Sequence, residues 1–409
     1  MKTIPVLLLA GLAYSPFAAK LTVAESPSST QYASITAALS DADAGDTILI
    51  TSKSTGDWQE SVTIDKRVMI TKSADIDSTA QITGTWTVTA SDTVVLNDLD
   101  IDGSLTYTSG SSTGVLLVSN CVVSGTVSTS GSNGGLLRIL GSSVQKVSAG
   151  AYYTLEALSN KVSGAMSFCR GDVIGNTFAY TTATLTVPNS SGVTDDTVQI
   201  IGNYFNGHLK WSSAQVSALI ANNYFDNDSQ TDTSIYIAGG ASGKLIRVSH
   251  NNIYSYYKVS TYGICSDDPA GTVMIDHNYV HGYSSSDSYV FAWKLVGTSA
   301  YLSVIYNTAN SVYSVTGSTN ADDYTGNKVS SSNTYTLTNA GSSDPVYNNV
   351  DGTQSTIGYE GGAHPYSLYH VNPGWVVESS RTPRVFEVSA PLKVTNGESF
   401  TLKARAFDR

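Results

Sequence analysis

The sequence predicts an all-β protein in which the chain coils as a solenoid of short parallel strands. Three observations support this prediction. A motif with one asparagine recurs along most of the chain, apolar residues are spaced by two rather than by 3.6, and Ser, Thr, Val and Gly dominate the composition. A helical protein would keep a 3.6-residue period over long stretches, which this chain does only near its N-terminus.

The repeated motif is an apolar residue, any residue, an apolar residue, two residues of any kind, an asparagine, any residue and an apolar residue. Residues 198–205, 246–253 and 273–280 contain the whole motif. The marked position recurs at a mean interval of 23 residues, at Asn97, Asn120, Ser142, Asn160, Asn176, Asn203, Asn223, Asn251, Asn278, Asn307 and Asn327.

A coiling chain explains this repeat because identical positions of stacked coils form ladders about 4.8 Å apart. The asparagine lies three residues after an inward-facing apolar residue. In a straight strand an odd separation would make it face outward, so a bend must turn the amide inward. Stacked amides can then hydrogen-bond to one another and to the backbone of the turn. The alternative is a β-sandwich whose turns contain asparagine by coincidence.

One segment has a helical pattern. Residues 30–43 place Ile35, Ala38 and Leu39 at helix spacing, and a turn at 44–46 and a strand at 47–50 follow. We expect a short amphipathic helix before the first coil, where it covers a sheet edge that would otherwise be an aggregation hazard.

The residues around this helix resemble those of a known group. Residues 32–39 (YASITAAL) and 44–48 (AGDTI) resemble the N-terminal cap of secreted right-handed parallel β-helix proteins of the pectate-lyase-like superfamily, and residues 56–64 loosely match the element that follows it. Residues 349–353 and 357–362 resemble the closing segment of many exported bacterial members. The resemblance covers residues 25–365 and implies a right-handed parallel β-helix of about eleven coils. It implies no single activity, because the superfamily includes lyases, hydrolases, esterases, epimerases and non-catalytic adhesins.

Residues 1–19 have the features of a secretory signal peptide. Lys2 supplies the positive charge, an apolar core runs from 4 to 12, and small residues follow. A buried N-terminal strand is the alternative, which Pro5 and Pro16 disfavour. No later apolar run reaches the roughly 18–20 residues that a membrane span needs. We therefore expect an exported monomer, secreted or held at the cell surface.

Residues 381–409 differ in character from the repeat. Residues 383–388 and 397–406 alternate between apolar and polar as antiparallel strands do, and they resemble the first strands of an immunoglobulin-like module. The sequence stops before a sandwich of about 100 residues can close. Either the sequence is a fragment, or these strands cap the solenoid.

The composition excludes two classes of protein. Charged residues make up 13% of the chain, against about 25% in an average domain, and the net charge of −11 argues against a nucleic-acid binder. Hydrophobic residues reach 41%, too many for a disordered polar chain. The three cysteines, Cys121, Cys169 and Cys265, are odd in number and lack metal-ligand spacing, so we expect small buried side chains rather than a disulfide framework.

Ionisable side chains gather in the coils that follow Asn203. Four of the six histidines, His208, His250, His277 and His281, fall there, two of them directly before the ladder asparagine. Histidine is the natural proton carrier near neutral pH. If the chain is an enzyme, we expect the catalytic residues to be His250, His277, Lys258 and Asp276. In the alternative, these histidines lie on polar strands and have no functional role.

The same coils offer candidate ligand-binding residues. We expect substrate to contact Tyr224, Tyr254, Tyr279 and His281, although tyrosine is also a good strand former. Lyases of the superfamily use a Lys or Arg base and usually Ca²⁺. Such an activity would make Asp226 and Asp228 the candidate Ca²⁺ ligands, but no lyase motif matches residue by residue.

Two hypotheses of function follow. In the first, the chain is an exported β-helix protein that binds extracellular polysaccharide or a cell-surface glycan and cleaves it as a lyase or glycosidase. In the second, it is a non-catalytic surface or adhesion protein. The longest coils, of 28, 27 and 29 residues, lie between Asn223 and Asn307. Long loops on one stretch of a solenoid commonly build its binding face, so both hypotheses place the site there.

Overall fold

The computed structural model describes most of the chain from Ala19 onward. The described ranges are 19–54, 56–74, 80–190, 197–213, 215–227, 233–256, 261–267, 271–283, 290–296, 301–310, 314–317, 325–330, 335–370, 384–389 and 403–407. The predicted signal peptide, apart from Ala19, lies outside them, as do Lys258 and Asp228.

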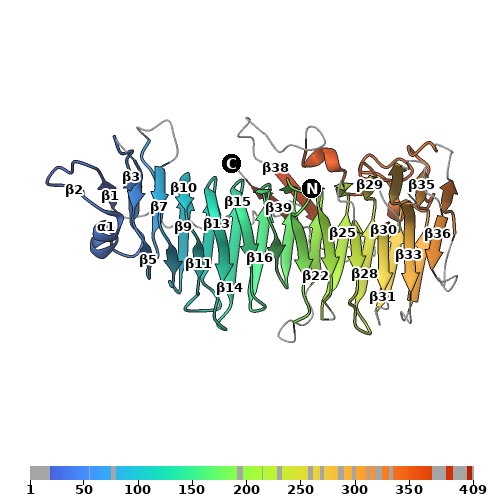
Figure 1. Cartoon of the computed structure of the whole chain (residues 1–409), viewed down its shortest axis with the longest axis horizontal. Helices are drawn as coiled ribbons and strands as arrows, with labels where there is room; N and C mark the ends of the chain where they lie inside the picture. The colour runs from blue at the N-terminus through green and yellow to red at the C-terminus, as the bar shows by residue number, and fades with distance from the viewer. Residues whose placement is uncertain are drawn as a thin grey trace, which may run out of the picture.

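The described strands form two long parallel sheets that stack coil on coil, which makes the fold a β-solenoid (Figure 1). Each middle coil gives one strand to the first sheet and then turns into the second. The first sheet consists, in spatial order, of β2 (Gln31–Tyr32), β1 (Lys20–Val23), β3 (Thr47–Ile50), β6 (Met69–Lys72), β9 (Thr93–Asn97), β12 (Val115–Ser119), β14 (Gly135–Leu140), β16 (Tyr153–Leu158), β19 (Gly171–Ile174), β22 (Thr197–Ile201), β25 (Ser217–Ala221), β28 (Leu245–Ser249), β31 (Thr272–Asp276) and β34 (Tyr301–Ile305).

The second sheet has two rows, because most coils bend once within it. The first row follows the ladder position and holds β4 (Trp58–Gln59), β7 (Ala80–Thr83), β10 (Leu99–Asp102), β17 (Lys161–Val162), β20 (Thr177–Phe178), β23 (Tyr204–Phe205), β26 (Tyr224–Asn227), β29 (Asn252–Tyr256), β32 (Tyr279–Tyr283), β35 (Thr308–Asn310) and β37 (Lys328–Ser330). The second row holds β5 (Val62–Ile64), β8 (Trp86–Val88), β11 (Leu105–Tyr107), β18 (Met166–Ser167), β21 (Thr184–Val187), β24 (His208–Trp211), β27 (Ile235–Ile237), β30 (Thr261–Asp267), β33 (Val290–Val296) and β36 (Ser314–Gly317). The long strands β13 (Val122–Thr129) and β15 (Ser143–Ser148) pair with both rows and join them.

The predicted asparagine ladder is present at the turn between the two sheets. From Asn160 to Asn307, the backbone N–H and the side-chain Nδ2 of each asparagine both donate to Oδ1 of the next, at 2.8–3.0 Å. Nδ2 also donates to a backbone carbonyl of a neighbouring coil, as from Asn160 to Ile139 at 2.8 Å. These bonds satisfy amides that are fully buried.

Two predicted members of the ladder are wrong. Strand register places Leu99 and Cys121 in the ladder column, and Cys121 N–H donates to the hydroxyl of Ser142 at 3.0 Å. Asn120 lies one residue earlier, in the left-handed conformation at φ 53°, and Asn97 ends β9. Asparagine tolerates the left-handed conformation better than most residues, so the sequence pattern confused the two neighbouring positions.

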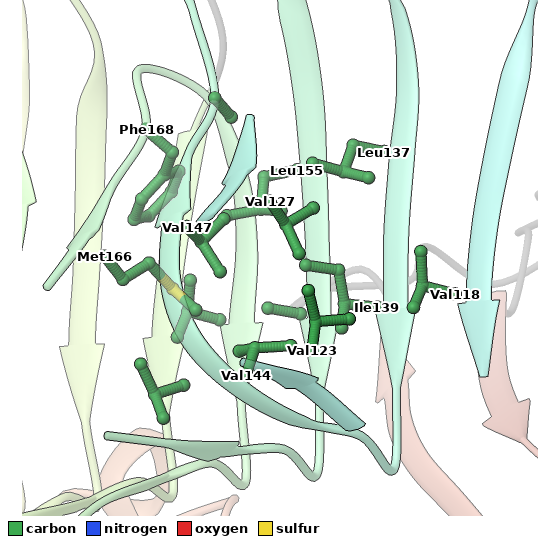
Figure 2. Close-up of a cluster of buried hydrophobic side chains, with 14 of the residues drawn as sticks. Val118, Val123, Val127, Leu137, Ile139, Val144, Val147, Leu155, Met166 and Phe168 are labelled. Carbon is green, nitrogen blue, oxygen red and sulfur yellow. The ribbon is translucent and has the colours of Figure 1, made fainter. Parts of the chain in front are cut away.

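The core is the narrow space between the sheets, filled by inward-facing aliphatic side chains. Figure 2 shows Val118, Val123, Leu137, Ile139 and Val144 converging there from successive strands. Further along, Phe178, Phe205 and Phe225 form a buried stack with ring centroids 4.5 and 4.6 Å apart. Each such side chain contributes about 1.5–3 kcal/mol by burial.

The predicted N-terminal helix is present as α1 (Ile35–Asp41). Ser34 caps it by accepting from the N–H of Ala37, and Glu60 accepts from the N–H groups of Ile35 and Thr36 at 2.9 and 3.0 Å. Ile35, Ala38 and Leu39 are buried, as the helical spacing predicted. The carboxylate of Glu60 therefore holds the helix end against the first coil.

Two other predictions concern the cysteines and the C-terminal strands. Cys121, Cys169 and Cys265 are buried and unpaired, as expected. Strands β38 (Arg384–Ser389) and β39 (Lys403–Phe407) pair antiparallel, while their resemblance to an immunoglobulin-like module stays a prediction. Across the described ranges no helix has the length and apolar character to cross a membrane.

After the last described coil, residues 335–370 form a return segment, which contains η1 (Pro345–Tyr347) and η2 (Tyr366–Leu368) and is coloured orange to red along the upper side of Figure 1. Successive residues of the return segment contact progressively earlier coils. Ser342 contacts His277, Ser355 contacts His250, and His370 contacts Gly202. The return segment therefore runs back along the turn between the two sheets.

Candidate functional site

The return segment covers a column of residues in the left-handed conformation. These residues directly precede the ladder position, and they include Asn222, His250, His277 and Tyr306 at φ 55–57°. At Gly202, in the same column, an added Cβ would lie 2.1 Å from the ring of Tyr369. A left-handed residue other than glycine costs roughly 1–2 kcal/mol, so contacts with the return segment must offset that cost at His250 and His277.

Asp276 lies at the centre of a buried polar network beneath the return segment. Its side chain is completely buried, and Arg247 donates to both carboxylate oxygens, from Nε at 2.9 Å and from Nη2 at 3.0 Å. Ser249 and His277 donate to Oδ1 at 2.6 and 2.9 Å. Burial alone would raise the pKa of Asp276, but the hydrogen bonds from His277 and Arg247 hold it well below its usual range.

The hydrogen bonds assign the protons of both histidines. Nε2 of His277 accepts from the backbone N–H of Ser342 at 3.0 Å, so its proton is on Nδ1 and points to Asp276. The hydroxyl of Ser249 donates its only proton to Asp276, so its oxygen accepts from Nδ1–H of His250 at 2.7 Å. Nε2 of His250 then accepts from the hydroxyl of Ser355 at 2.9 Å. Both rings are neutral in this arrangement.

Burial explains why His250 stays neutral. It lowers the pKa of His250 to about 3, with smaller contributions in the same direction from His277 and Arg247 and an opposing one from Asp276. The two imidazole rings stack with centroids 4.8 Å apart and planes 6° apart. Tyr306 and Tyr347 pack against His277 at 5.5 and 4.8 Å.

The network is a poor metal site, although ligand atoms of His250, Asp276 and His277 lie within 4.8 Å of one another. Both oxygens of Asp276 already accept hydrogen bonds, and each imidazole nitrogen has a partner. A cation would have to replace the like-charged Arg247. Proton transfer to a substrate would require the return segment to leave, because Ser355 and His277 are completely buried.

The sequence-predicted catalytic residues are therefore only partly brought together. His250, His277 and Asp276 are in contact, while Lys258 lies outside the described residues. Of the other two histidines, His281 lies on β32 and His208 on β24, in different rows of the second sheet. The four histidines do not form one cluster.

The predicted ligand-binding residues lie on the outer face of the first row of the second sheet. We call Tyr204, Tyr224, Tyr254 and His281 the tyrosine row. Tyr204 and Tyr224 stack at 5.6 Å, Tyr224 and Tyr254 at 5.2 Å, and Tyr254 contacts His281 at 5.6 Å. All four side chains are partly exposed. Burial lowers the pKa of His281.

Several side chains border the tyrosine row. Tyr279, also predicted to bind substrate, is mostly buried, and its hydroxyl lies 3.0 Å from Nδ1 of His281. Tyr359 of the return segment packs edge-on against Tyr224 at 5.5 Å. Asp226, a predicted Ca²⁺ ligand, accepts from the hydroxyl of Tyr204 at 3.0 Å. Its predicted companion Asp228 is outside the described residues, so Ca²⁺ binding stays a prediction.

Sequence reasoning missed the partners of Asp276. Ser249 and Asp276 occupy the same motif position, two residues before the ladder asparagine, and pair directly in the register of β28 and β31. Arg247 precedes Ser249 by two residues and so faces the same way. Alignment of the repeats could have found this group, but the contacts of Ser342 and Ser355 lie outside the repeat.

Comparisons with protein-family models, with curated proteins and with solved structures find no match to this chain.

Proposed function

We propose that this chain is an exported scaffold that binds extracellular polysaccharide or a cell-surface glycan along the tyrosine row. The observation that supports it most is the alignment of four partly exposed aromatic side chains on one face of a straight stack of coils. Tyrosine combines an apolar ring with a polar hydroxyl, as a sugar combines apolar and polar faces. Neighbouring coils repeat about every 4.8 Å, so the row suits an extended chain.

The rings of the row stack on one another, so we expect their edges and hydroxyl groups to meet the ligand. This arrangement favours hydrogen bonds to sugar hydroxyls, with the aromatic edges excluding water. The low charge of the chain and its excess of Ser, Thr, Asn and Tyr agree with a neutral polar surface of this kind. The residues of the N-terminal cap support membership of the pectate-lyase-like superfamily, and the signal-peptide features of residues 1–19 support export. Both form part of the proposal.

We propose that binding occurs without chemistry at His250, Asp276 and His277. Their side chains form hydrogen bonds within the network and with the return segment. They are buried and so separated from the outer face. The enzyme hypothesis would need Lys258 together with a group on the tyrosine row, such as His281.

A glycan-binding screen of the chain from Lys20 onward tests the proposal. We expect retention by at least one polysaccharide in affinity electrophoresis, and a loss of about tenfold or more in affinity in Tyr224→Ala and Tyr254→Ala. Tyr152→Ala is the matched control, because Tyr152 is 47% exposed and lies before β16, away from the row. Equal loss in the control, or retention by no glycan, would contradict the proposal.

The same protein separates binding from cleavage. Incubation with polyuronates and neutral glycans, with and without Ca²⁺, is followed by ultraviolet absorbance for lyase products and by reducing-end release for hydrolysis. We expect neither signal. Turnover that His277→Ala or Lys258→Ala abolishes would support the enzyme hypothesis instead.

A further inference from the structure

A groove marks the part of the solenoid where the coil is shortest. The coil from Asn160 to Asn176 has 16 residues, and the next has 27. Its outer surface is hollowed into a groove of about 640 Å³. Gln145 and Lys146 line one side, residues 163–165 the floor, and Tyr180 and Thr182 the other side.

The floor of the groove is fixed by the backbone. Ser163 N–H donates to the carbonyl of Val144, and Val147 N–H donates to that of Ala165, both at 3.0 Å. At Gly164, an added Cβ would lie 2.7 Å from the carbonyl oxygen of Gln145, so a larger residue would have to displace the backbone. Beneath the floor, Met166 is buried in the core (Figure 2). The groove is therefore preformed.

The walls of the groove contain the ammonium group of Lys146, the amide of Gln145 and the exposed ring of Tyr180. Gln145, Lys146 and Thr182 are exposed, and Tyr180 is 56% exposed. Among the described residues Lys146 forms no ion pair. Tyr180 is one of few large side chains with apolar surface that are so exposed, which favours a ligand with an apolar face of its own.

The local charge is opposite to that of the whole chain. Residues 143–172 contain three bases, Lys146, Lys161 and Arg170, and two acids, Glu156 and the buried Asp172. Glu156 is paired with Arg138 at 2.6 Å. In a chain of net charge −11, this stretch has a local excess of positive charge, which attracts an anion.

The groove and the tyrosine row lie on the same face. Lys161, two residues before the floor, pairs with Thr177, and Thr177 pairs with Tyr204, the first residue of the row. Two strand spacings, about 10 Å, separate the floor strand from Tyr204 along the stack. A chain-like ligand could therefore occupy both.

We propose that the groove is a subsite for a carboxylate-bearing sugar unit of a glycan that continues along the tyrosine row. This inference rests on the proposed function and adds the position and charge of one unit. Lys146 pairs with the carboxylate, the Tyr180 ring packs on the apolar face of the sugar, and Gln145, Ser163 and Thr182 bond to its hydroxyls. The volume falls in the range of about 300–1,000 Å³ that is usual for small-ligand sites.

Calorimetric titration with a uronic-acid hexasaccharide and with its carboxyl-reduced counterpart tests the subsite. We expect the acidic form to bind at least about fivefold more tightly, with a preference that weakens as salt rises. Lys146→Ala should remove that preference, Lys146→Arg should keep it, and Tyr180→Ala should weaken both ligands. Lys328→Ala, an exposed lysine on β37, and Tyr152→Ala are the controls.

The outcomes separate this inference from the proposed function. If Tyr254→Ala loses binding while Lys146→Ala and Tyr180→Ala bind the acidic glycan as the parent does, the subsite is wrong and the tyrosine row stands. Equal affinity of the parent for the two hexasaccharides also overturns the subsite. If the parent binds neither hexasaccharide nor any glycan of the screen, both proposals fail.

Discussion

At the scale of single residues, Asp276 is the side chain on which the buried network depends. Its carboxylate receives hydrogen bonds from Arg247, Ser249 and His277. Asp276→Ala leaves the partly buried guanidinium of Arg247 without a carboxylate partner, so we expect a loss of about 3–5 kcal/mol in the free energy of unfolding. Urea denaturation measures it. Asp226→Ala removes a partly exposed carboxylate and should cost under about 1.5 kcal/mol, and equal losses would show that the network contributes little.

The buried histidines predict a loss of stability in acid. Burial lowers the pKa of His250 to about 3 and that of His370 to about 4, below the value near 6.5 in the unfolded chain. Folding therefore favours the neutral rings, and their contribution, complete above pH 6.5, falls as the pH drops toward 4 and 3. The charged and titratable groups facing His250 are Asp276, His277, Arg247 and His364. Asp276 is the only carboxylate among them, and its hydrogen bonds hold its pKa below that window.

Unfolding experiments between pH 7 and pH 4.5 check this prediction. We expect the free energy of unfolding to fall by about 1 kcal/mol per pH unit for each histidine. His250→Asn should reduce the slope, although it also lowers stability at pH 7. A slope in the variant as steep as in the parent would show that His250 does not titrate with folding.

At the scale of elements, the ladder asparagines link each coil to the next. Asn223→Ala removes the Oδ1 that accepts from the backbone N–H and Nδ2 of Asn203. Two buried donors would lose their acceptor, and we expect a cost of about 2–5 kcal/mol. Asn206→Ala, which changes a partly exposed amide bound weakly to Ala179 at 3.4 Å, is the control. A difference of less than a few degrees between the melting temperatures of the two variants would contradict the prediction.

The sequence predicted the elements that repeat. The solenoid, the ladder from Ser142 onward and α1 could be predicted because each depends on local spacing. The position at Asn120 was wrong because the left-handed residue and the ladder residue are neighbours that both accept asparagine. Asn97 lies two residues before the ladder position, at the end of β9, and Asp98 is the left-handed residue there. Residues 349–353 and 357–362 resembled a closing segment, but the path of the return segment along the coils could not be predicted. Ser342 meets His277 across 65 residues and His370 meets Gly202 across 168, with no repeat to mark these contacts. The contact of Asp276 with Arg247 joins two coils, so it becomes visible in the sequence only when the coils are aligned in register.

At the scale of the whole molecule, the solenoid sets the length of the binding face. The groove floor follows β17, and Tyr254, the last tyrosine of the row, lies on β29, which is four strand spacings or about 19 Å away along the stack. Each coil adds a similar strip of surface, so the face is a linear array rather than a closed pocket. A ligand should therefore gain affinity with length only until it spans this distance.

The dependence of affinity on oligosaccharide length is the most direct test of the account. With a homologous series of a glycan that the protein binds, we predict a dissociation constant that falls stepwise with each added sugar and then becomes constant once the chain reaches from the groove to Tyr254. Tyr254→Ala should shorten the length at which this plateau begins, whereas Tyr152→Ala should leave it unchanged. A dissociation constant independent of length, or a plateau that Tyr254→Ala does not move, would contradict binding along the tyrosine row.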